Sequence, residues 1–152
     1  MKSEVVQIVL AFLTLVLGCA AEELLPKFVG VGFPILMSAT VFLASRHRIS
    51  LSIYFAIAAG AAEDALSGLP PATSASFFLA VVALAKWSEF PNGALIVMSY
   101  PVYQGWLRLW TGAAYGSMFY RVLVAVPLGL VTAFATWVVL AWAERRAAVD
   151  GA

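Results

Sequence analysis

The stretch GAAEDALSGLPPATSAS, residues 60–76, places two adjacent carboxylates, Glu63 and Asp64, near the end of an apolar segment. Gly68 follows one turn later, and after Leu69 come Pro70 and Pro71. Carboxylates in an apolar helix are costly unless they are paired or hydrated. The two carboxylates are therefore expected to be either paired with other groups or hydrated. Which of these holds depends on the solvent around the chain.

The composition indicates that this solvent is lipid. The 152 residues are 63% hydrophobic and only 11% charged, and the mean hydropathy is +0.96. Soluble domains are closer to half apolar and about a quarter charged. The length allows a single transmembrane domain over residues 1–152. A net charge of +1 without a basic cluster excludes nucleic acid as a partner and leaves membrane lipids.

Apolar segments recur along the chain between polar, proline and glycine residues. Most are long enough to cross the hydrocarbon core at about 1.5 Å per residue, and none alternates as barrel strands do. We therefore predict an all-α integral membrane bundle of about six transmembrane helices, three of them kinked by Pro34, Pro101 and Pro127. The expected helices cover residues 5–21, 29–45, 50–66, 73–87, 93–111 and 118–143.

The basic residues predict the orientation of this bundle. With both termini in the cytoplasm, the inner connections hold six of them and the outer half only three, as the positive-inside rule expects. The inner residues are Lys2, Arg46, Arg48, Lys86, Arg145 and Arg146, and the outer ones are Lys27, Arg108 and Arg121.

The first segment has an alternative interpretation. The run Val16-Leu17-Gly18-Cys19 resembles a lipoprotein signal with a lipidated cysteine. Leu17 is large where such signals favour a small residue, and Glu4 interrupts the basic start. A retained first helix with Cys19 as a small packing residue is therefore favoured, and the mass of the intact protein distinguishes the two.

The third segment carries small residues and Asp64 on one face. Ser52, Ala56, Gly60 and Asp64 recur every fourth residue, which predicts close packing against another helix and an Asp64 that points into the bundle. Glu63 lies about 100° away and is expected at the hydrated rim or against a partner.

Two arginines lie at a depth similar to that of Asp64, so an intramembrane ion pair is expected. Gln104 and Arg108 continue a polar stripe from Tyr100 on the fifth segment. The predicted intramembrane polar cluster consists of Asp64, Arg108, Arg121, Gln104 and Tyr100.

Three roles are open for this polar cluster. It could fix the packing of the helices, bind a small ligand or a partner, or catalyse a reaction. Catalysis is disfavoured because no activated nucleophile, histidine base or metal shell accompanies the acids. No metal or cofactor is expected, and His47, between two arginines, is expected to be solvated at the lipid headgroups.

Four motifs resemble the rod-shape-determining protein MreD family. They are EELLP (22–26), GFPIL (32–36), RHR (46–48) and GAAEDALSGLP (60–70), in which Asp64 matches the family's acid and Glu63 is additional.

The resemblance implies a non-enzymatic component of the bacterial cell-wall elongation complex in the inner membrane. It implies an MreC-like protein, a RodA-type glycosyltransferase and a class B penicillin-binding protein as partners, under MreB filaments. The alternative is the substrate-binding subunit of an energy-coupling-factor-type transporter, to which the family's helices are similar. A membrane enzyme acting on lipid-linked precursors is a third class.

Overall fold

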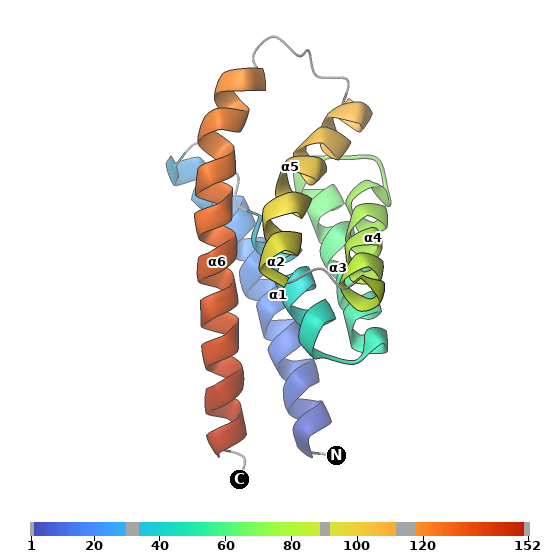
Figure 1. Ribbon diagram of the computed structural model, residues 1–152, viewed down its shortest axis with the longest axis vertical. Helices are drawn as coiled ribbons and strands as arrows, with labels where there is room; N and C mark the ends of the chain where they lie inside the picture. Colours follow the sequence, from blue (N-terminus) through green and yellow to red (C-terminus); the bar gives the residue numbers. More distant parts are fainter. Residues whose placement is uncertain (1, 30–33, 89–91, 112–117, 151–152) are drawn as a thin grey trace.

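The computed structural model describes residues 2–29, 34–88, 92–111 and 118–150, and every element in these ranges is a helix or a turn. The predicted all-α class is therefore confirmed. The helices are α1 (Lys2–Val29), α2 (Ile35–Arg46), α3 (Ile49–Ser67), α4 (Thr73–Trp87), α5 (Asn92–Thr111) and α6 (Met118–Asp150). The start of α1 and the end of α6 lie at the same end of the bundle (Figure 1).

Within the described chain, two helices are long and apolar enough to cross a membrane. They are α1, over Glu4–Leu25, and α3, over Ile49–Ser67. Large apolar side chains are exposed along α1 and α6, a surface that suits lipid better than water. Among the side chains of these two helices with the largest exposed fractions are Val5, Phe12, Leu17, Val131 and Phe134.

The second helix differs from its predicted span of 29–45. Val29 still belongs to α1, and α2 begins only after Pro34, so it has 12 residues and is about 18 Å long. Proline lacks the N–H group that a helix interior needs, and it also disfavours helical backbone at the residue before it. Pro34 therefore precedes its helix, whereas Pro101 and Pro127 lie inside α5 and α6.

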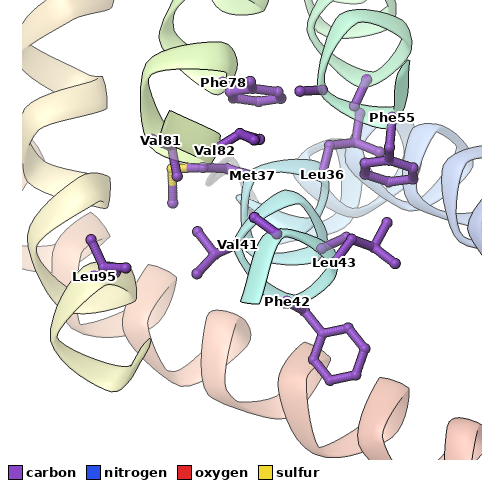
Figure 2. Packing of buried hydrophobic residues seen from close by; sticks show 14 of the residues in the cluster. Leu36, Met37, Val41, Phe42, Leu43, Phe55, Phe78, Val81, Val82 and Leu95 are labelled. Atoms are coloured by element: carbon purple, nitrogen blue, oxygen red, sulfur yellow. The ribbon is translucent and has the colours of Figure 1, made fainter. Parts of the chain in front are cut away.

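Helix α2 forms the centre of the bundle. It contacts all five other helices, and each of its residues from 36 to 44 is buried. Figure 2 shows Met37 and Val41 facing Val81 and Val82 of α4, while Phe42 points toward α6. A helix that is apolar on all sides is stable only when other helices surround it. The shortest helix is thus the core on which the longer helices pack.

Candidate functional site: carboxylates at the starts of two short helices

Asp64 lies on the buried face of α3. Ser52, Ala56 and Gly60 are buried on the same face, and Asp64 is only 4% exposed. A Cβ atom added to Gly60 would lie 2.3 Å from Cα of Ala75 in α4. Glycine at this position therefore allows the backbones of α3 and α4 to touch, which brings the Asp64 carboxylate to the first turn of α4.

The Asp64 carboxylate caps α4. Its Oδ1 accepts a hydrogen bond of 2.7 Å from the buried N–H of Ser74, in the first turn of that helix. Ala72, at the N-cap position, provides no side-chain cap. The first N–H groups of a helix lack intrahelical partners and carry partial positive charge, so a carboxylate is a favourable acceptor there.

The same residue also ends α3. Its backbone carbonyl accepts the N–H groups of Gly68 and Leu69, and Gly68 adopts a left-handed conformation with a φ of 62°. Glycine is suited to this position because it has no Cβ to clash. Asp64 therefore joins the end of one helix to the start of the next through both its backbone and its side chain.

Glu22 of α1 serves α2 in the same way. Its Oε1 accepts a hydrogen bond of 2.8 Å from the N–H of Leu36. Pro34, at the N-cap position of α2, gives no side-chain cap. Each short helix thus begins under a carboxylate of the helix before it.

Sequence reasoning missed this role of Glu22, which entered only through the EELLP motif. A signal was present in the sequence: in both cases an acid near the end of a long apolar helix is followed by prolines and then by the start of the next helix. The acid and the N–H group that it accepts are 14 residues apart for Glu22 and 10 residues apart for Asp64.

Glu63 faces α1. Its side chain is half-buried, and its carboxyl group lies next to that of Glu22, whose second oxygen, Oε2, is buried without a hydrogen-bond partner in the described structure. Three carboxyl groups from α1 and α3 therefore gather where α2 and α4 begin. The expected place of Glu63, at the hydrated rim or against a partner, stays a prediction.

Helix α5 completes the site with two aromatic residues. The hydroxyl of Tyr103 is 2.9 Å from Oγ of Ser74, and Nε1 of Trp106 donates to the carbonyl of Thr73 at 2.9 Å. Tyr103 is 3% exposed and packs on Phe77 with ring centroids 4.9 Å apart. The first turn of α4 is thus held from one side by Asp64 and from the other by α5.

Only part of the predicted polar cluster lies among the side chains that the structure describes. The Asp64 carboxylate contacts Ser74, and no ion pair of the described residues joins it to Arg108. Gln104 and Arg108 are half-buried on α5. The side chains of Tyr100 and Arg121 lie outside the described part of the structure, so the pairing of Asp64 with Arg121 stays a prediction.

His47 is buried, and the expectation that it is solvated is wrong. Its side chain is 2% exposed, and Nε2 lies 3.0 Å from Oε1 of Glu144 in α6. Cys19 is partly buried against the core. Sequence reasoning missed the partner of His47 because 97 residues separate the two.

The geometry of the carboxylates favours a structural role. Two of the three acids accept hydrogen bonds from helix starts, and among the described residues no three His, Cys, Asp or Glu side chains are placed to hold a metal ion. No family model, no curated protein and no solved structure matches this chain. Its function must therefore be argued from its own residues and their geometry.

Proposed function

We propose that this chain is a non-catalytic scaffold protein of the bacterial cell-wall elongation complex, similar to the MreD family, in the inner membrane. One observation carries the proposal: Glu22 of the EELLP motif and Asp64 of the GAAEDALSGLP motif each cap the next short helix. The carboxylates of these motifs then serve to hold the helices in place. A protein whose polar residues fix its shape is suited to present a constant surface to partners.

In this proposal six helices pack within the bilayer and both termini are cytoplasmic. The exposed apolar side chains of α1 and α6 favour lipid contact, and the start of α1 and the end of α6 lie at the same end of the bundle (Figure 1). Helices α2 and α4, about 18 and 22 Å long, are too short to span alone, and the surrounding helices cover them.

The topology predicts the behaviour of reporter fusions. Alkaline phosphatase, which is active only in the periplasm, should be inactive when fused after Ala152. A fusion after Leu69, in the turn between α3 and α4, is the matched control and should be active. Strong activity after Ala152 would refute the cytoplasmic placement of the C-terminus.

The function predicts which proteins copurify. A chain tagged at its C-terminus and extracted in mild detergent should bring down an MreC-like protein, a RodA-type glycosyltransferase and a class B penicillin-binding protein, identified by mass spectrometry. A multi-pass protein of the same bacterium with the same tag is the control. Recovery of an ATPase with a membrane coupling subunit would replace the proposal with transport. Turnover of a lipid-linked precursor that is lost in D64A would replace it with catalysis.

A further inference from the structure

The cytoplasmic end of the proposed bundle contains a buried junction between the α2–α3 turn and α6. His47 lies in this turn, and the ring of Phe42 is 6.4 Å from its imidazole. Phe42 in turn meets Trp137 of α6 edge to face, with ring centroids 5.0 Å apart. Phe42 therefore connects His47 to the helix against which the turn packs, as its orientation in Figure 2 illustrates.

The charges around His47 come from three helices. Glu144 of α6 lies 3.0 Å from Nε2, but its other oxygen is 3.4 Å from Nη1 of Arg46, so two groups share one carboxylate. Lys86 of α4 donates its ammonium hydrogen bond to the carbonyl of His47. Although the two atoms are close, the contact between Nε2 and Glu144 does not have the geometry of a hydrogen bond. In the described structure Nε2 is therefore buried without a hydrogen-bond partner.

A proton on His47 is therefore unfavourable in the packed junction. It would add a third cation next to Arg46 and Lys86 and would bury its charge away from water. Burial is the largest cause that lowers the pKa of His47 from its ordinary value of about 6.5, Arg46 and Lys86 lower it further, and Glu144 opposes them. An imidazole released into water recovers the ordinary pKa.

The sign of the pH effect follows from this difference. Below about pH 6.5 a hydrated His47 binds a proton, while the packed one binds it only at a lower pH. Acid therefore stabilises the opened junction relative to the packed one, and the packed junction is fully favoured above the ordinary pKa.

Helix α6 has a small number of fully or largely buried apolar side chains near this junction. In its described part, Ala133 and Leu140 are the buried hydrophobic residues, Trp137 and Ala141 are partly buried against the core, and many other side chains are exposed. Elements with few buried apolar contacts open at the lowest free-energy cost.

We propose that His47 makes the docking of α6 on the α2–α3 turn acid-sensitive: the junction is closed while His47 is neutral and opens when His47 is protonated. The device does not depend on the proposed role in cell-wall elongation, but its contact with the cytoplasm rests on the proposed topology. It would let cytoplasmic acidification change the surface that α6 presents at the inner face of the membrane.

The protonation step is measured directly because His47 is the only histidine of the chain. Protein with a histidine-free tag and labelled histidine, in lipid nanodiscs, gives a single imidazole titration by NMR. We expect a midpoint below about 6.5, and K86Q should move it upward by removing a flanking cation. A wild-type midpoint at or above the ordinary value would overturn the proposal.

The opening is measured as a distance. Spin labels at the exposed positions Ser50 and Arg145, in a C19S background, report the separation of the α3 start from α6. The distance distribution should be narrow at about pH 8 and longer and broader at about pH 5. H47Q should lose this change, and K86Q should reduce it.

A matched control is E4Q, which removes the exposed Arg48–Glu4 ion pair at the same end of the bundle and should keep the full pH response. A distribution that is unchanged between the two pH values, or a change that persists in H47Q, overturns the proposal. If H47Q does not fold, an acid response of the same size in K86Q as in the wild type overturns it.

Discussion

Replacing Gly60 with alanine should lower the melting temperature of the detergent-solubilised protein by roughly 6–12 °C, equivalent to about 3 kcal/mol for a chain of this size. The added Cβ would lie 2.3 Å from Cα and 2.4 Å from the backbone nitrogen of Ala75. Both atoms belong to the backbone of α4, so no side-chain rotation relieves the overlap. The two helices must separate, which also pulls the N–H of Ser74 away from Asp64.

Two other glycines provide graded controls for this substitution. A Cβ at Gly105 would meet no atom within 4 Å, so G105A should be neutral or raise stability by up to about 1 kcal/mol through helix propensity. A Cβ at Gly18 would meet the end of the Leu36 side chain, which is flexible, so G18A should lie between the two. Equal effects of G60A and G105A would contradict the close approach of α3 and α4.

Removal of the Asp64 side chain should have the second large effect. D64A leaves the buried N–H of Ser74 without an acceptor and removes a negative charge from the start of α4, at a cost of about 2–4 kcal/mol. D64N keeps an oxygen that can accept the bond, so it should lose about 1 kcal/mol or less. Thermal unfolding in detergent measures how much more stability D64A loses than D64N. Amide exchange in the first turn of α4 should also be faster in D64A than in the wild type.

The same experiment tests the ion pair predicted from the sequence. If Asp64 balanced a buried arginine, D64N would strand that charge at a cost of about 3–5 kcal/mol, and neutralising Arg108 or Arg121 would partly rescue it. The capping geometry predicts a mild D64N and no rescue. E63Q is the matched control for the neighbouring acid and should change stability little, while E22A should repeat the D64A effect at the start of α2.

Local sequence information was sufficient for the helical class and for much of the helix pattern. Apolar runs bounded by proline and glycine predict helices because backbone groups in lipid must bond within their own segment. The small residues from Ser52 to Gly60 also predict the face of α3 that is buried, since side-chain direction repeats with the helical period.

The contacts of the charged residues were decided by the tertiary structure. The sequence matched Asp64 with arginines by depth, but in the described structure its carboxylate accepts the backbone N–H of Ser74, a donor that every residue except proline has. His47 is buried because α6 brings Glu144 to this turn, which is polar in sequence, and packs Trp137 on the neighbouring Phe42. Helical periodicity determines which way a side chain points from its own helix. The group it meets depends on how helices distant in sequence pack, and that packing is the sum of many weak contacts.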